Sequence, residues 1–213
     1  MKFLIQILFF IMGLILFSFG ISVAIKVQYL GIHPWDVLNL TLHKKIGLSI
    51  GSWNIIVGLF LVSITLFLDR KYVHIGTFLN AILVGVLVDF FVFLDLTPHS
   101  SSDFINVLIL LCAITLMGFG GGMYSAAGIG AGPRDGFMLS ISEKLGLSIR
   151  IIRIAVETIV LIIGLLLGGP VFIFTFIYTF IQSPIFQFSF LLCSKGLKRM
   201  TLHLEQSKNA KSA

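Results

Sequence analysis

Charged residues are scarce in this sequence. Of its 213 residues only 11% are Asp, Glu, Lys or Arg, whereas 57% are hydrophobic, and the mean hydropathy is +1.07. Soluble domains carry about 25% charged residues, so this composition excludes an ordinary soluble fold. It also excludes a chain that is disordered in water. We expect the net charge of +6 to set membrane topology, since no nucleic-acid-binding motif accompanies it.

Cysteine is nearly absent, and so are the signatures of enzymes. Cys112 and Cys193 both lie inside apolar runs and belong to no metal-ligand spacing such as CxxC. The five histidines are scattered, and no HExxH, GxSxG or phosphate-binding loop occurs. We therefore expect no metal, no cofactor and no enzymatic activity.

Long apolar runs dominate what is present. Six are long enough to cross a bilayer as helices, at about 3–25, 52–68, 75–94, 104–127, 151–167 and 171–193. We predict an all-α polytopic membrane protein, with one membrane domain over residues 1–194 and a basic tail over 195–213. The bilayer is then its main partner, beside a candidate homo-oligomer or membrane partner.

The positions of Lys and Arg predict the orientation. They gather at 69–71, at 134–150 and in the tail, whereas the connections at 95–103 and 168–170 have none. By the positive-inside rule both termini then lie in the cytoplasm. Lys26, Lys44 and Lys45 depart from this pattern, because six spans place them outside.

An internal repeat divides the chain into two halves, about 1–97 and 98–194. Residues 31–50 align without a gap to residues 130–149, with nine of 20 positions identical. The identical pairs include Pro34 with Pro133, Asp36 with Asp135, and Gly47 with Gly146. If each half has three spans, the halves are inserted in opposite orientations, which is a recurrent architecture of secondary transporters.

Each half contains one short helix between proline and glycine, at 34–46 and 133–145. Such a helix reaches only about 18 Å, so re-entrant, interfacial and spanning arrangements all stay open. Broken segments at matching places in two halves indicate a transporter's binding site. Asp36 and Asp135 either cap these helices or contact a ligand.

Polar residues near these short helices and inside the apolar runs form the candidate binding site. Arg153 and Glu157 are four residues apart, so they share a helix face and can pair, either as a functional group or as a structural ion pair. The candidate substrate-binding residues are Asp36, Asp135, Arg134, Trp35, Arg153, Glu157, Asn54 and Asn80.

The stretch GAGPRDG at 130–136, SIRIIR at 148–153 and GLLLGG at 164–169 resembles the YczE/YyaS/YitT family of bacterial integral membrane proteins. The likeness covers about residues 5–192. It implies a multi-pass protein of the bacterial cytoplasmic membrane and brings no substrate or reaction. Where the family has a GGxxGxGT pattern, this chain carries Phe172 and Phe174, which narrow any approach of a ligand to the backbone.

These observations favour a permease for a small solute or ion, or an export permease, in which one half rocks against the other around the short helices. The alternative is a membrane-embedded accessory or assembly protein without transport activity. No ATPase motif is present, so transport needs an ion gradient or another subunit.

Overall fold

The computed structural model describes residues 2–96 and 100–212, and this part of the chain contains helices and short connections but no strand. The all-α prediction is therefore confirmed. The helices are α1 (Lys2–Lys26), α2 (Pro34–Ile46), α3 (Ile50–Leu68), α4 (Ile75–Leu94), α5 (Asp103–Ala126), α6 (Pro133–Leu145), α7 (Ile149–Leu166) and α8 (Ile173–Ser212). Single 3₁₀ turns, η1 (Gln28–Leu30) and η2 (Arg70–Tyr72), follow α1 and α3.

Five of these helices are long and apolar enough to cross a membrane, namely α1, α3, α4, α5 and the Ile173–Thr201 part of α8. The prediction of six spans therefore holds for five of its runs. The remaining run forms α7, whose 18 residues include Arg150, Arg153 and Glu157. Charged side chains are costly in lipid, so α7 does not qualify as a span by its composition.

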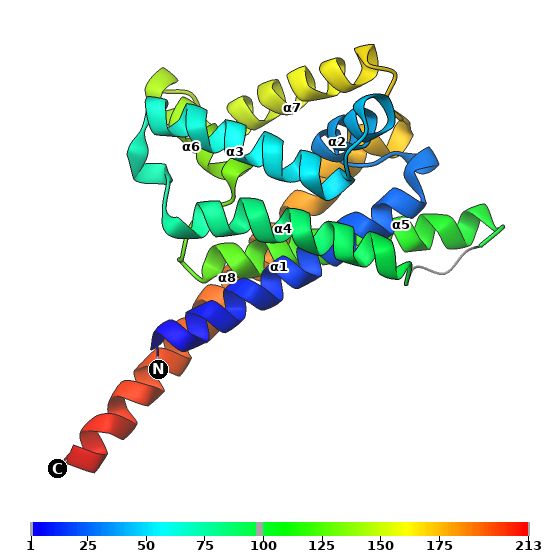
Figure 1. The fold of residues 1–213 in the computed structure, drawn as a ribbon. Coiled ribbons are helices and arrows are strands. Elements are labelled where there is room, and N and C mark those ends of the chain that lie inside the picture. The colour runs from blue at the N-terminus through cyan, green and yellow to red at the C-terminus, as the bar shows by residue number, and fades with distance from the viewer. Residues whose placement is uncertain (1, 97–99, 213) are drawn as a thin grey trace.

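The last helix is longer than the sequence indicates. α8 continues from residue 173 to residue 212, so the last apolar run and most of the basic tail form one helix of 40 residues. Figure 1 shows its C-terminal part extending beyond the bundle, at the same end as the start of α1. The final residue of the predicted tail lies outside the described residues.

The two short helices begin and end as the sequence predicts. Pro34 opens α2 and Pro133 opens α6, where a missing N–H costs nothing. Gly47 and Gly146 follow the last helical residues with φ of 87° and 64°, a region that glycine adopts without strain. Each helix has 13 residues, too few to cross a bilayer easily.

The centre of the bundle is the crossing of α1 and α5, with α4 packed on α1 and α8 packed on α5 (Figure 1). Glycines allow this close approach. A Cβ on Gly13 would lie 2.5 Å from the backbone nitrogen of Tyr124, and one on Gly120 would lie 2.5 Å from that of Phe17. Small residues at such crossings are how membrane helices gain packing contacts.

The short helices join the first four helices to the last four. α6 packs on α3, and α2 packs on α7. The segments before them pack on the starts of α8 and α4: a Cβ on Gly31 would lie 2.6 Å from the nitrogen of Thr175, and one on Gly130 would lie 2.7 Å from that of Thr77. Each broken segment is thus held against the start of a long helix from the other part of the chain, and the candidate site lies where the two short helices begin.

Candidate functional site

A cavity of about 80 Å³ lies where the N-termini of α2 and α6 meet, and every helix contributes to its wall. A cavity needs roughly 10–15 Å³ measured this way to hold one water, so this cavity has room for more than one. Seven of the eight predicted binding residues line it: Trp35, Asn54, Asn80, Arg134, Asp135, Arg153 and Glu157. The eighth, Asp36, lies behind Arg134 and contacts it.

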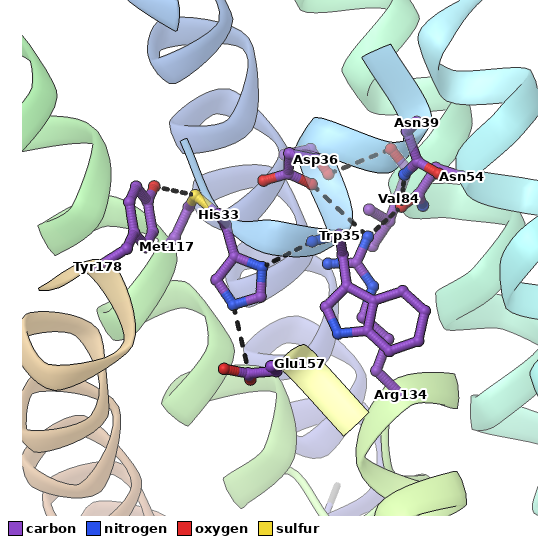
Figure 2. A network of polar contacts seen from close by, with 11 residues as sticks. His33, Trp35, Asp36, Asn39, Asn54, Val84, Met117, Arg134, Glu157 and Tyr178 are labelled. Atoms are coloured by element: carbon purple, nitrogen blue, oxygen red, sulfur yellow. Dashed lines mark hydrogen bonds and ion pairs between the residues drawn. The ribbon is translucent and has the colours of Figure 1, made fainter. Parts of the chain in front are cut away.

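Arg134 holds the first turn of α6 against α2 and α3. Its Nη2 donates a hydrogen bond of 2.7 Å to Asn54 Oδ1 and lies 3.6 Å from Asp36 Oδ1. The guanidinium also lies over the Trp35 ring, 5.3 Å from its centroid (Figure 2). Asp36 is only 2% exposed, and a carboxylate buried this deeply is strongly destabilising without a partner.

The structure gives both acids of the repeat an arginine on another helix as partner. Arg153 Nη2 of α7 donates to Asp135 Oδ1 of α6 at 3.1 Å, just as Asp36 of α2 faces the arginine of α6. The side-chain cap of α2 is His33 instead, whose Nδ1 accepts from the Trp35 N–H at 3.4 Å. Neither acid is thus the N-cap of its helix: Asp135 lines the cavity, and Asp36 pairs with Arg134, which lines it.

Glu157 is 8% exposed and faces the short helix of the first half. Its Oε1 lies 3.8 Å from His33 Nε2 (Figure 2). The predicted partner of Glu157 was Arg153, but the ion pair that the structure gives Arg153 goes to Asp135. Both side chains line the cavity, so they do share one face of α7.

Two ionisable cavity residues, His33 and Tyr124, are missing from the predicted site. His33 is 7% exposed and Tyr124 is 5% exposed, and both line the cavity. His33 was grouped with the scattered histidines, although its position directly before the repeat's proline was a usable signal. Tyr124 follows a glycine-rich stretch and has no counterpart in the aligned repeat, so no sequence signal marked it.

Two buried donors on the cavity wall have no hydrogen-bond partner among the described residues. They are Trp35 Nε1 and Asn80 Nδ2, on side chains that are 3% and 5% exposed. A buried donor without a partner costs about 1–3 kcal/mol, so an acceptor atom that reached either donor would offset that cost. Both donor atoms are shielded from a water-sized probe, so neighbouring side chains must move before a molecule in the cavity can reach them. Asp36 Oδ2 and Asn39 Oδ1 also lack partners, but these residues do not line the cavity.

Two larger openings border the cavity. One is a groove of about 750 Å³ between α7 and α8, and the other is a pocket of about 390 Å³ beside η2, α5 and α6. Arg153 and Phe186 line the cavity and both openings. These two side chains therefore stand between the polar interior and the surroundings of the bundle.

One end of α6 is tied to the connection between α3 and α4. Glu143 accepts hydrogen bonds from Lys71 Nζ and, at 2.6 Å, from the Tyr72 hydroxyl. The Lys71 bond, and then the Tyr72 bond, hold the pKa of Glu143 below its usual value. The same bond to Glu143 raises the pKa of Lys71.

The described residues hold no group of three or more His, Cys, Asp or Glu arranged to bind a metal ion. The cavity wall offers paired acids, two arginines and amide or indole donors instead. This set can bind and orient a polar solute by hydrogen bonds and charge.

The helices and the cavity define an all-α, multi-pass membrane protein with a cavity inside the bundle that charged and amide side chains line. A family of unknown function, DUF6198, matches residues 4–190, and the chain belongs to this family. No solved structure matches the chain.

Three relatives share most of their length with the chain. The uncharacterized membrane protein YczE of Bacillus subtilis (strain 168) is 36% identical over 181 residues, 85% of this chain and 83% of its own. An uncharacterized protein of Haemophilus influenzae is 31% identical over 163 residues, 75% of this chain and 72% of its own. The uncharacterized protein YyaS of B. subtilis is 28% identical over 164 residues, 75% of this chain and 79% of its own. The resemblance to YczE and YyaS is thus confirmed.

Proposed function

We propose that this protein is a secondary permease that carries a solute through the central cavity without changing it chemically. The observation that carries the proposal is the cavity itself, lined by charged and amide side chains inside the bundle, between the N-termini of two half-length helices. Ionisable side chains are rarely kept inside a membrane bundle unless they line a pathway or pair with one another. Discontinuous helices that meet near the midplane are typical of transporter binding sites.

The proposed architecture is a pair of inverted repeats, and the packing supports it. In the proposed repeat, α1 to α4 correspond in order to α5 to α8. The contact of α3 with α6 then corresponds to the contact of α7 with α2. The contact of α1 with α4 corresponds in the same way to the contact of α5 with α8. The same correspondence relates two threonine caps: His74 N–H donates to Thr77 Oγ1 at 3.2 Å, and Phe172 N–H donates to Thr175 Oγ1 at 3.3 Å. In this arrangement α7 crosses as the sixth helix although its composition does not mark it as a span, because Arg153 and Glu157 face the cavity instead of lipid.

The short helices end at opposite ends of the bundle, as inversion requires. Lys44, near the end of α2, donates a 2.6 Å hydrogen bond to Gln28, which follows α1. An ion pair joins Lys26, the last residue of α1, to Asp95, which follows α4, so α1 and α4 finish at this same end of the bundle. Glu143, near the end of α6, bonds instead to the connection that follows α3.

Several polar contacts at the cavity join the two proposed halves, so they are the contacts that a rocking motion would break. Arg134 of the second half binds Asn54 and Asp36 of the first, and Glu157 of the second half faces His33 of the first. In the proposed cycle, a bound solute replaces part of these contacts when the cavity opens. Net transport then needs an ion gradient or another subunit.

Accessibility of the cavity from both sides of the membrane tests the permease proposal. Ala81 is 2% exposed and lines the cavity, whereas Ala113 is 0% exposed and does not. In a protein without Cys112 and Cys193, we expect an impermeant methanethiosulfonate to modify Ala81→Cys from either side of a sealed vesicle. Ala113→Cys is the matched control and should stay unmodified. Modification of Ala81→Cys from one side only, or from neither, would favour the accessory role.

A further inference from the structure

The two halves differ in how the third and fourth helices of each pack. α3 packs along α4, whereas α7 packs on α2 and α6 and leaves the groove of about 750 Å³ against α8. Figure 1 shows α7 at the edge of the bundle, away from the line of α8. The polar interior therefore has a lateral opening on this side.

The walls of this groove are mainly apolar. Ile154 is 51% exposed on α7, and Phe176 and Phe180 are 61% and 69% exposed on α8. The lining of α7 extends over residues 149–161, which is about 18 Å at 1.5 Å per residue. In an apolar window of α8, 18% of the residues are buried, against 33% to 50% in the other four candidate spans, so the rest of the described chain covers less of this helix than of the others.

The inner end of the groove is polar and is continuous with the cavity. Arg153, Glu157, Ser183 and Phe186 line both. Arg150, exposed in the first turn of α7, adds a second cation to the groove wall. An elongated apolar surface that ends at arginines and leads into a cavity with polar side chains matches a molecule with an apolar chain and a polar head.

Arg150 and Arg153 in the groove, together with the free donors of the cavity wall, favour a head with negatively charged acceptor oxygens. Among the described residues, the donors without partners on lining side chains are Trp35 Nε1 and Asn80 Nδ2, whereas the cavity acids have partners, Asp135 with Arg153 and Glu157 with His33. Groups that bring acceptor oxygens would satisfy these donors, and arginine prefers oxyanions with which it can form two parallel hydrogen bonds.

We propose that the molecule carried is an anionic amphiphile, which enters sideways from the bilayer through the groove between α7 and α8. Its apolar chain lies between the two helices, and its oxyanion head reaches Arg153 and the donors of the cavity. This inference rests on the proposed permease function and assigns its substrate class. A water-soluble solute would not need the groove.

Tryptophan fluorescence can test the inference, because the chain has only two tryptophans. Trp53→Phe leaves Trp35, on the cavity wall, as the reporter. The full chain is placed in phosphatidylcholine vesicles and titrated with decyl phosphate, inorganic phosphate and decyltrimethylammonium. We expect decyl phosphate to change Trp35 emission in a saturable way, at concentrations about tenfold or more below those needed for the other two, a difference of about 1.4 kcal/mol or more.

Two further substitutions separate the groove from general effects on the membrane. Thr158 is exposed in the groove, so Thr158→Phe should weaken the decyl phosphate response by about tenfold, or about 1.4 kcal/mol. Thr115 is exposed on α5 away from the groove, so Thr115→Phe should leave the response unchanged. Equal effects of both variants would overturn the inference.

The other outcomes also decide. If inorganic phosphate acts as strongly as decyl phosphate and Thr158→Phe has no effect, the amphiphile inference fails while the permease proposal stands. If decyltrimethylammonium binds as well as decyl phosphate, the assigned charge is wrong. If Thr158→Phe converts a dimer into a monomer, a second copy fills the groove and the inference is overturned. No response to any probe also overturns it, and the accessibility of Ala81→Cys then decides the permease proposal separately.

Discussion

Replacing Arg134 by Met should destabilise the protein more than any other single arginine substitution in the cavity wall. Arg134 is the cation beside Asp36, which is 2% exposed, and the variant leaves this carboxylate buried without its counter-charge. Breaking a buried ion pair on one side costs about 3–5 kcal/mol. The variant also removes the 2.7 Å hydrogen bond to Asn54, although Asn39 still donates to the same oxygen at 3.3 Å. We therefore expect a loss of about 3–5 kcal/mol.

The double variant Arg134→Met with Asp36→Asn should recover most of that loss, because it removes the buried charge together with its partner. A double-mutant cycle, measured by SDS-induced unfolding in mixed micelles and followed by circular dichroism, should give a coupling of about 2 kcal/mol or more. Arg150→Met, at an exposed position, is the control and should change stability by less than about 0.5 kcal/mol. A loss below about 1 kcal/mol for Arg134→Met, or purely additive effects, would refute the reasoning.

Two other predictions concern packing and pH. A Cβ on Gly51 would lie 2.0 Å from the carbonyl oxygen of Gly85, so Gly51→Ala should force α3 from α4 and cost about 1–3 kcal/mol or more in the same unfolding assay. Gly196→Ala, with open space around it, should not destabilise the protein, and a loss equal to that of Gly51→Ala would contradict the packing argument. The hydrogen bonds from Lys71 and then Tyr72 lower the pKa of Glu143 from its usual 4.5. The ionised carboxylate therefore stabilises the folded state at pH values above 4.5. This stabilisation is lost as the pH falls through the lowered pKa, where Glu143 becomes protonated. The thermal midpoint of wild type should exceed that of Glu143→Gln at neutral pH, and this difference should vanish on acidification; a difference that persists well below pH 4 would show another origin.

The elements that the sequence predicts best are those with local signals. Pro34 marks the start of α2, because proline lacks an N–H donor that the first turn of a helix does not need. Gly47 marks its end, because glycine readily adopts the positive φ that follows the last helical residue. The last helix lacks such a signal. Its lysines suggest a solvated tail, and only the structure shows the helix continuing to residue 212. α7 was predicted from its apolar residues, although its charges set it apart from the five candidate spans.

The candidate site divides in the same way. The repeat alignment pointed to the starts of the short helices, and the structure places Trp35, Arg134 and Asp135 on one cavity wall. Which acid pairs with which arginine in the site depends on how the helices pack, and the spacing of residues along one helix does not predict that packing. Four-residue spacing suggested Arg153 with Glu157, but the docking of α6 beside α7 gives Arg153 to Asp135.

The central claim is that two inverted halves enclose the cavity, and sidedness of the short helices tests it most directly. Ile46 and Leu145 are equivalent residues of the repeat, end α2 and α6, and are 64% and 62% exposed. In a background with Cys112→Ala and Cys193→Ala, single substitutions Ile46→Cys and Leu145→Cys are labelled in intact cells with an impermeant thiol reagent. The account predicts that Ile46→Cys reacts from outside and that Leu145→Cys reacts only after permeabilisation. Reaction of both from the same side would contradict the inverted arrangement and the permease mechanism based on it.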